Sequence, residues 1–441
     1  MGPLLHRIFR LNERSPFENA LALHAAGRHE EAESAYRHIL ALDPQHLDAQ
    51  HHLGILLHQT GRSLEGIDLI LRGLEAQPGH AARYNDMGNV LTQAGDLTHA
   101  ALAFKMSLDC NATDANVWNN LGSVWHRQNN VAEAESAYRQ ALQLAPDFVP
   151  ALSNLARLLA ETGRDEESSL LSCRAFVQPP LAEKPPKQLG IAYYRLGRLA
   201  EAADCYRAWL RAEPGNPVAQ HYLAACSREQ VPARASDDFI TAMFDDMAEA
   251  FDEKLVGSLD YRGPEIIAGL LAMHLEPHQA LDVLDGGCGT GLCAAVLAPY
   301  ARRITGVDLS AAMLAKARER ACYTELVEME LTSYLRKNQK TFDLIVLADI
   351  LIYFGDLNEV LSAAKQALRA NGWLAFTVEY STPAEGQAPY RLDASGRFSH
   401  DTAYVRQALE SAGLTALALQ EVALRNEFCK PVQGMAVLSR C

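Results

Sequence analysis

A glycine-rich segment at residues 285–291 has the residue types best suited to holding a small ligand. It reads Asp-Gly-Gly-Cys-Gly-Thr-Gly and directly follows a short apolar run, so it lies where a predicted strand ends. Glycine lets a backbone approach a ligand where any Cβ would collide. Gly287, Gly289 and Gly291 therefore predict a loop that cradles a bound molecule.

Two classes of cofactor compete for this loop. The spacing of Gly289 and Gly291, with Asp308 further along, also fits the dinucleotide-binding pattern and keeps a nicotinamide-dependent oxidoreductase as an alternative. Asp285 favours the other class, because a carboxylate at the end of the strand repels a pyrophosphate and attracts a positively charged ligand. The charge of Asp285 thus weighs against a dinucleotide.

The pattern D-x-G-x-G-x-G resembles the first motif of class I S-adenosylmethionine-dependent methyltransferases, with Asp285, Gly287, Gly289 and Gly291 at the matching positions. The resemblance implies a methyltransferase whose cofactor is S-adenosylmethionine, held by this loop at its methionine part. Asp308 matches the acidic residue that accepts the two ribose hydroxyls in this family. Transfer from a sulfonium requires no metal, so we expect none.

Three later segments extend the resemblance. Met313 lies one turn into the helix after the second strand and is expected near the adenine face. Glu330 and Leu331 follow the third strand, where the family places an acidic residue on the adenine amino group, although Glu328 is an alternative for that residue. Asp349 follows the fourth strand, which implies a position beside the reacting methyl group.

An apolar helix face precedes the glycine-rich loop. Phe244 and Phe251 share this face with Met247 and Ala248, because their spacing is helical. The pattern resembles the lid helix that many small-molecule methyltransferases fold over the cofactor, although packing against the sheet would give the same spacing. Arg262, further along, could pair with the cofactor carboxylate.

A hydroxyl or ammonium acceptor would have to lose a proton during methyl transfer. His400 is the candidate catalytic base because the ordinary pKa of histidine is near neutral, and Asp349 and Tyr353 are its candidate catalytic partners. His400 could equally bond a loop carbonyl. A second alternative for the whole chain is a scaffold whose cofactor-binding domain has lost catalysis.

The fold expected for this part of the chain is α/β and Rossmann-like. From residue 281 onward, short apolar runs alternate with helical stretches, which predicts a mostly parallel sheet with helices on both faces. Ligands bind such sheets beyond the carboxyl ends of the strands. Seven strands are predicted, at residues 280–285, 303–308, 323–329, 342–348, 372–378, 414–422 and 434–440.

The preceding part of the chain repeats with a period of 34 residues (61 − 27 = 34). The series from Trp118 to Pro146 resembles the tetratricopeptide repeat, which implies an all-α superhelix of six units with a capping helix. The period is carried by Gly27, Gly61, Gly95, Asn129, Gly163 and Gly197. Small residues are expected where paired helices approach closely, at Ala32, Gly66, Ala100, Ala134, Ser168 and Ala202. Large side chains fill the space beside them, at Tyr36, Ile70, Phe104, Tyr138 and Tyr206.

The chain is therefore expected to be multidomain. We predict a repeat array with its capping helix at residues 10–228, a linker at 229–235 and the methyltransferase domain at 236–441. The whole sequence resembles the bacterial group of predicted methyltransferases fused to tetratricopeptide repeats. That resemblance does not carry over a methyl acceptor.

The first helix of each repeat forms a concave face, the usual recognition surface of such arrays. Asn85, Asn119, Asn120 and Asn154 are expected on this face. An asparagine offers both a donor and an acceptor, so the series predicts a groove that binds the backbone of a protein or peptide. The alternative explanation is that these residues serve helix stacking or are solvated polar positions.

Composition excludes several classes of partner. The net charge of −14 repels a phosphate backbone, so nucleic acid is not expected as a partner. No apolar run has the length needed to cross a bilayer. The nine cysteines are scattered and contain no C-x-x-C pair, which argues against both a disulfide framework and a structural zinc site. Reduced cysteines are typical of the cytosol, so a cytoplasmic protein is predicted.

Overall fold

The computed structural model describes residues 14–245, 247–253, 257, 259–278, 280–381, 388–428 and 430–441. The chain divides into two compact units, Met1–Gln178 and Pro179–Cys441, and each is described by itself. Residues 10–13 of the predicted repeat array lie outside the described residues. Within the described part of the chain, every helix is too short or too polar to cross a lipid bilayer.

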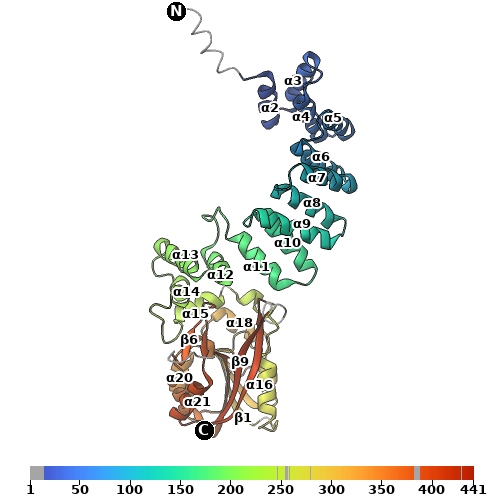
Figure 1. The fold of residues 1–441 in the computed structure, drawn as a ribbon. Coiled ribbons are helices and arrows are strands. Elements are labelled where there is room, and N and C mark those ends of the chain that lie inside the picture. Colours follow the sequence, from blue (N-terminus) through green and yellow to red (C-terminus); the bar gives the residue numbers. More distant parts are fainter. Residues whose placement is uncertain are drawn as a thin grey trace, which may run out of the picture. The chain divides into compact units, whose positions relative to one another are not determined.

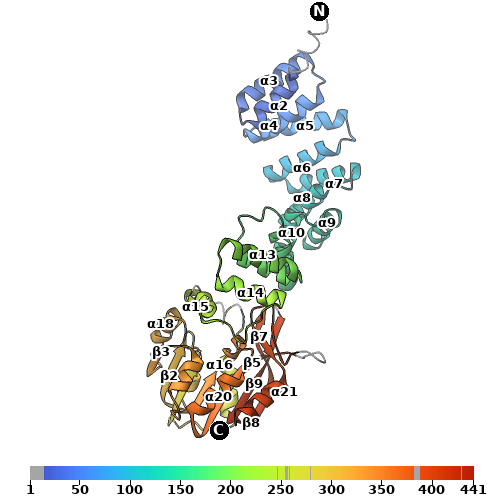
Figure 2. The same cartoon turned by 90° about the vertical axis from the view of Figure 1, so that its left-hand side faces the viewer.

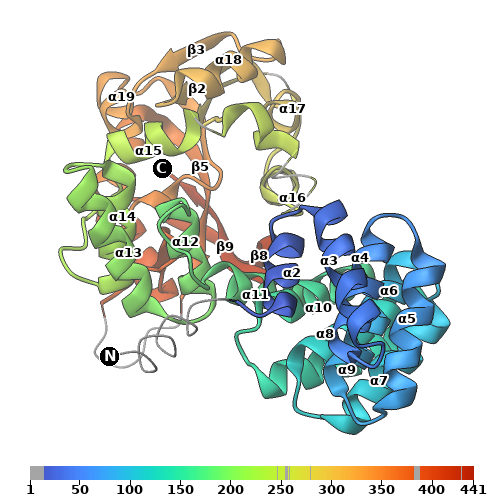
Figure 3. The same cartoon turned by 90° about the horizontal axis from the view of Figure 1, so that it is seen from above.

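The first unit is built of paired helices that wind around a common axis (Figure 3). Helices adjacent in the sequence pack against each other in each pair, and each pair packs on the next. The helices are α2 (Pro16–Ala25), α3 (His29–Leu42), α4 (Leu47–Gln59), α5 (Ser63–Ala76), α6 (Ala81–Ala94), α7 (Leu97–Cys110), α8 (Ala115–Arg127), α9 (Val131–Leu144), α10 (Val149–Glu161) and α11 (Asp165–Phe176).

The 34-residue period marks the tight turn inside each pair. Gly95, for example, follows α6 with φ of +87°, a left-handed conformation that glycine adopts without strain. Gly27, Gly61, Gly163 and Gly197 do the same, and Asn129 replaces glycine in the fourth unit with φ of +62°. Asparagine is the other residue that tolerates this conformation, so the period survives the substitution.

Close helix contacts also follow the predicted pattern. A Cβ added to Gly88 would lie 2.5 Å from the ring of Phe104, and one added to Gly122 would lie 2.7 Å from the ring of Tyr138. In the fifth unit, Ser168 uses its hydroxyl to donate a hydrogen bond of 2.7 Å to the carbonyl of Ala156. The departure from alanine at this position is therefore accommodated by a polar contact between the paired helices.

The predicted asparagine series bonds across neighbouring repeats. Asn120 donates to the side-chain oxygens of Asn85 (3.3 Å) and Asn89 (3.2 Å), and Asn154 donates to the side chain of Asn119 (2.9 Å). Asn119 is also buried. These contacts tie one repeat to the next, as the helix-stacking interpretation expects.

The second unit begins with the last repeat. It contains α12 (Pro186–Arg195), α13 (Leu199–Ala212) and α14 (Pro217–Ser227), followed by α15 (Asp237–Asp245). The ring of His221 on α14 stacks on Phe239 of α15 at 3.8 Å, and its Nε2 donates to the carbonyl of Gly396 at 2.8 Å. The capping helix α14 thus packs on α15 and on the segment at Gly396, and the sixth repeat lies in the same compact unit as the sheet. The domain boundary at residue 228 stays a prediction based on the repeat pattern.

All seven predicted strands are present, and their order is β3-β2-β1-β4-β5-β9-β8. The first five are parallel, whereas β9 runs antiparallel between β5 and β8. Figure 2 shows β2 and β3 at one edge and β8 at the other. The strands are β1 (Leu281–Gly286), β2 (Ala301–Asp308), β3 (Glu325–Glu328), β4 (Phe342–Leu347), β5 (Leu368–Tyr380), β8 (Thr415–Glu427) and β9 (Lys430–Arg440).

A short hairpin adds two further strands, β6 (Tyr390–Leu392) and β7 (Phe398–His400). Strand β7 pairs with the last two residues of β5. Ala224 and Ala225 on α14 pack in one cluster with residues of this hairpin. The hairpin therefore joins the sheet to the last repeat.

Helices cover both faces of the sheet (Figure 1). One face carries α16 (Gly263–Ala272) and α17 (Ala294–Leu297), whose apolar residues pack with those of β1, β4 and β9. The other face carries α19 (Leu331–Lys337), α20 (Asn358–Ala367) and α21 (Thr402–Ser411). The prediction of helical repeats followed by a mostly parallel α/β sheet is confirmed.

Candidate active site

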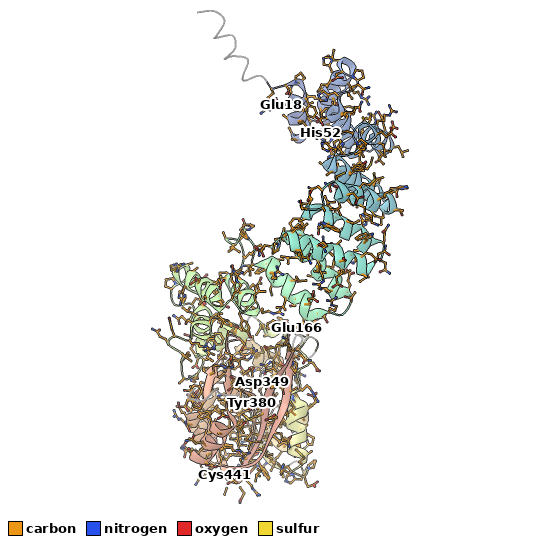
Figure 4. The ribbon with its side chains drawn as sticks, viewed as in Figure 1. Glu18, His52, Glu166, Asp349, Tyr380 and Cys441 are labelled. Atoms are coloured by element: carbon orange, nitrogen blue, oxygen red, sulfur yellow. The ribbon has the colours of Figure 1, made fainter. Side chains whose placement is uncertain are left out.

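A cavity of about 480 Å³ lies at the carboxyl ends of β1, β2 and β4, the edge at which the fold class predicts a ligand. Figure 4 labels Asp349, which follows β4, and Tyr380, which ends β5. Both lie far from Cys441, because β9 runs antiparallel to β5. Asp285 and Asp308 both line the cavity.

The glycine-rich loop forms one wall of this cavity. The backbone N–H groups of Gly287 and Cys288 donate to the carbonyl of Val307, which fixes the loop against β2. Gly287 and Gly289 both have positive φ, and a Cβ at Gly287 would collide with the side chain of Ile350. Among the described residues, a Cβ at Gly289 would have only Phe251 within reach, at 4.0 Å. The backbone at Gly289 is therefore open to a ligand.

Two carboxylates contact this region, of which Asp285 is buried and Asp308 half-buried. Asp285 accepts a hydrogen bond of 2.6 Å from the hydroxyl of Tyr323, and Asp308 accepts one of 2.8 Å from the N–H of Gly289 and one of 2.9 Å from the N–H of Ser310. Burial raises the pKa of Asp285 to about 6, with the charge of Asp308 adding to the effect and the Tyr323 hydroxyl opposing it. Burial also raises the pKa of Asp308. A cationic ligand would favour the ionised form of both.

The predicted adenine end is formed by residues that follow β2 and β3. Met313 on α18 (Ala311–Glu319) is buried and lines the cavity, as do Glu330 and Leu331. The carboxylate of Glu330 caps α19, accepting from the N–H groups of Thr332 (2.9 Å) and Ser333 (2.7 Å). Burial alone would raise the pKa of Glu330, but these donors lower it below its ordinary value. Glu330 is therefore held as a fixed anion at this end.

A buried ion cluster lies beyond β4. Asp349 accepts hydrogen bonds from Nη1 of Arg425 at 2.9 and 3.0 Å. Arg425 is 4% exposed and also contacts Glu379 and Glu427. Arg397 contacts the same two glutamates. Asp349 has a left-handed backbone conformation, with φ of +56°. Two contacts hold it there: its carboxylate pairs with Arg425, and its N–H donates to the hydroxyl of Thr377 at 2.8 Å.

The lid prediction needs a correction. Phe244 and Phe251 do line the cavity, with ring centroids 5.9 Å apart. They do not lie on one continuous helix, because α15 ends at Asp245 and a separate 3₁₀ turn, η2 (Ala248–Ala250), follows. Tyr353 meets the ring of Phe244 edge-on at 5.7 Å and closes the same side.

Two carboxylates, on Asp245 and Asp252, hold this segment onto the cofactor side of the cavity. Asp245 accepts a hydrogen bond of 2.5 Å from the hydroxyl of Ser310. Asp252 contacts the hydroxyl of Thr290 and the guanidinium of Arg320. Asp252 thus bonds this segment to Thr290 of the glycine-rich loop, and a lid role for the segment stays a prediction.

Three predicted site residues are not among the described residues that line the cavity: Gly291, Arg262 and His400. Gly291 supports the loop, since a Cβ there would lie 2.9 Å from Tyr323. Arg262 begins α16 and donates its backbone N–H to Leu424.

His400 is fully buried in β7 and has a structural role. Its Nε2 donates to the carbonyls of Phe354 (2.8 Å) and Gly355 (3.2 Å). Burial lowers the pKa of His400 to about 4. The geometry therefore does not support His400 as a catalytic base, and it matches the alternative that this histidine bonds a loop carbonyl.

Sequence reasoning missed Arg425, Arg397 and Glu427. The predicted sixth strand ended at residue 422, so Arg425 and Glu427 fell outside it. The sequence did contain a signal for them, because Arg425 and Glu427 are two residues apart directly after an apolar strand. If the strand continues, this spacing places both side chains on the same face of the sheet.

Among the described residues, acidic, His and Cys side chains do not gather in groups of three that could hold a metal ion.

Family comparisons agree with this geometry. Residues 283–372 match the methyltransferase domain family. Residues 23–87, 115–148 and 188–217 match tetratricopeptide repeat families.

Similar curated proteins are methyltransferases. A malonyl-[acyl-carrier protein] O-methyltransferase of Acetivibrio thermocellus is 34% identical over 116 residues, which are 24% of this chain and 38% of that protein. A ubiquinone biosynthesis O-methyltransferase of Albidiferax ferrireducens is 26% identical over 149 residues, which are 32% of this chain and 59% of that protein. The chain thus spans less than two thirds of the length of either relative.

Solved structures also resemble the two parts. An S-adenosylmethionine-dependent methyltransferase from Mesorhizobium loti is 24% identical with a TM-score of 0.33, covering 41% of this chain and 100% of that one. The protein MamA is 19% identical with a TM-score of 0.33, covering 35% of this chain and 91% of that one. The family matches show that the chain contains tetratricopeptide repeats and a methyltransferase domain.

Proposed function

We propose that the protein is a class I methyltransferase that transfers the methyl group of S-adenosylmethionine to an acceptor. The observation that carries this proposal is the pair of carboxylates, buried Asp285 and half-buried Asp308, lining one cavity beside a glycine loop open at Gly289. Two neighbouring carboxylates repel each other when both are ionised, which suits a ligand carrying an ammonium and a sulfonium. A dinucleotide would add two phosphate charges to the same place.

Each part of the cavity has a role in holding this cofactor. Asp285 would accept hydrogen bonds from the ammonium of its methionine part, and Asp308 would accept them from its ribose. Met313, Glu330 and Leu331 would hold the adenine. The fit is supported by the open backbone at Gly289 and by the raised pKa of both aspartates, which a bound cation would lower again.

When bound, the cofactor supplies an activated methyl group on a sulfonium. The chain aligns an acceptor with that methyl group and excludes water. Phe244, Phe251 and Tyr353 form an aromatic cover that serves the second task. Asp349, held by Arg425, bounds the space where the acceptor must stand. A proton lost by the acceptor would pass to Asp349 or to water, since His400 lies outside the cavity lining formed by the described residues.

The first unit is proposed to bind a protein. The concave faces of tetratricopeptide arrays support this role. The amide groups of Asn85, Asn119, Asn120 and Asn154 already bond to one another or to Asn89. A peptide backbone would therefore pair with their remaining donors and acceptors. The relative from Acetivibrio thermocellus is named for a substrate on a carrier protein, which makes a protein-bound acceptor one class to test.

The test is transfer of label from methyl-labelled S-adenosylmethionine to fractionated cell extract by the full-length protein. Label in a protein or metabolite fraction, lost in the Asp308→Ala variant, supports the proposal. Cofactor binding without labelled product in any fraction would favour a scaffold with an inactive domain.

A further inference from the structure

The cavity has two halves of different origin. One half, the cofactor half, is lined by residues 285–331 at the ends of β1, β2 and β3. The other half is lined by residues of α12 and α14 and by residues 394–428. Asp349, for which the sequence motif implies a position beside the reacting methyl group, follows β4 and accepts a hydrogen bond from Arg425, which lines the second half. If the cofactor fills the first half, as proposed above, the acceptor must occupy the second.

One face of α12 contributes to this second half. Lys187, Ile191 and Tyr194 all line the cavity, and their spacing of four and three residues places them on the same side of the helix. Tyr222 on α14 joins them. We call these four residues the sixth-repeat wall.

The sixth-repeat wall is fixed to the catalytic sheet. Arg195, next to Tyr194, places its guanidinium 3.8 Å above the ring of Phe428, which also lines the cavity. Tyr222 lies against Gly396, where an added Cβ would be 2.9 Å from its ring. The wall therefore cannot shift away without breaking contacts to the loop between β6 and β7 and to the end of β8.

The wall uses the recognition face of the repeat. In the 34-residue register, Lys187 occupies the position that Asn119 holds two repeats earlier (187 − 119 = 68) and Asn85 three repeats earlier. This position lies on the first helix of the pair, which forms the concave face of such arrays. In the sixth repeat, the side of α12 that corresponds to this recognition surface therefore lines the cavity at the end of β4.

A second hollow of about 450 Å³ leads away from the wall. It shares Tyr194, Ala394, Ser395, Arg397 and Glu427 with the first cavity, so the two adjoin. Its lining also includes Arg228, which is exposed. The second hollow thus lies beside the acceptor half, with Tyr194 in the lining of both.

We infer that the sixth repeat is the acceptor-recognition element of the enzyme, with Tyr194 contacting a flat, largely apolar group next to the accepting atom. The rings of Tyr194, Tyr222, Tyr353 and Phe428 line this half of the cavity. Aromatic rings bind flat apolar groups through offset or edge-on contacts. Arg397 and Arg425 lie nearby, but both are already paired with carboxylates. They therefore form part of the wall and do not make this half a binding site for an anion. The acceptor class is thus an aromatic or similarly flat molecule, free or attached to a carrier.

The test requires no knowledge of the natural acceptor. Two stable analogues of S-adenosylmethionine are used in which a nitrogen replaces the sulfonium sulfur and carries either a methyl or a benzyl group. With the cofactor bound as proposed, the benzyl group would project from the cofactor half toward the sixth-repeat wall. Dissociation constants are measured by calorimetry on the full chain, on Tyr194→Ala, and on Gln188→Ala, an exposed α12 residue absent from the lining that the described residues form.

Tyr194→Ala is expected to weaken the benzyl analogue by roughly 2- to 10-fold and to leave the methyl analogue unchanged, because one aromatic contact is lost. Gln188→Ala is expected to change neither. Unaltered benzyl affinity in Tyr194→Ala, or equal weakening of both analogues, would overturn the inference. Failure of the wild-type chain to bind the methyl analogue would instead refute the proposed cofactor site.

Discussion

Replacing Arg425 by methionine should destabilise the sheet-containing unit severely. Arg425 is 4% exposed and contacts three carboxylates, on Asp349, Glu379 and Glu427. Methionine keeps most of the side-chain length and removes the charge. Arg397 still contacts the two glutamates, but Asp349 loses the partner that holds both of its oxygens.

The expected loss follows from leaving buried carboxylates without their cation. Removing one partner of a buried ion pair costs about 3–5 kcal/mol, which for a unit of this size lowers its melting temperature by about 6–20 °C. The matched control is Arg391→Met, because Arg391 pairs with Asp393 nearer the surface, with side chains 43% and 29% exposed. An exposed pair contributes about 0–1 kcal/mol, so this control should melt within about 4 °C of the wild type.

The deficit should also depend on pH. Without Arg425, the buried carboxylates have folded-state pKa values raised above those of the unfolded chain, and burial already raises the pKa of Glu379 in the intact cluster. When folding raises the pKa of a carboxyl group, the protein loses stability at pH values above the pKa that the group has in the unfolded chain. This loss disappears as the pH falls through the pKa that the group has in the folded chain.

Scanning calorimetry between pH 5 and 8 should therefore show the deficit of Arg425→Met shrinking toward low pH. The transition of the first unit serves as the internal reference. A melting temperature within about 2 °C of wild type at all pH values would refute this account of the ion cluster.

Three further predictions concern the repeats, the cofactor loop and the buried histidine. Gly88→Ala should destabilise the first unit by about 1–3 kcal/mol in urea unfolding followed by circular dichroism, because its Cβ meets a buried ring; Gly73→Ala, with open space, should be neutral or stabilising. Binding of S-adenosylmethionine should weaken below about pH 6, where Asp285 is protonated. Tyr323→Phe should raise the midpoint pH of this weakening, because it removes a hydrogen bond that lowers the pKa of Asp285. An unchanged midpoint pH would contradict the role of Tyr323. His400→Ala should leave the dissociation constant for S-adenosylmethionine within about twofold, and a larger change would reopen its place in the site.

Much of the fold was predictable because its signals are local. The 34-residue period required only glycine or asparagine at each turn, and Asn129 kept the same left-handed backbone. The apolar runs predicted the seven main strands for the same reason. The two strands of the β6–β7 hairpin were missed because three residues are too few to show an alternating pattern.

The site was predictable only where a motif fixes the backbone. Asp285, Gly289 and Asp308 were placed by the loop pattern, and they do line one cavity. Arg425 could not be placed, because only the pairing of β8 with β9, and of β9 with β5, brings it to Asp349.

Tertiary burial also decided features that intrinsic preferences could not. His400 was chosen for its ordinary pKa, which burial in β7 lowers. The position of α12 depends on contacts of Arg195 with Phe428 and of α14 with Gly396, far away in the sequence. A repeat period alone gives no indication that the sixth unit faces a catalytic cavity.

The central claim is that Asp285 and Asp308 hold S-adenosylmethionine, and calorimetric titration of this cofactor into the full chain tests it most directly. Wild type and Asp401→Ala, whose side chain lies outside the described cavity lining, should bind one equivalent. Asp308→Ala should bind at least about tenfold more weakly, because hydrogen bonds to a charged group are lost. Wild-type affinity in Asp308→Ala, or tighter binding of NAD than of S-adenosylmethionine, would contradict the account.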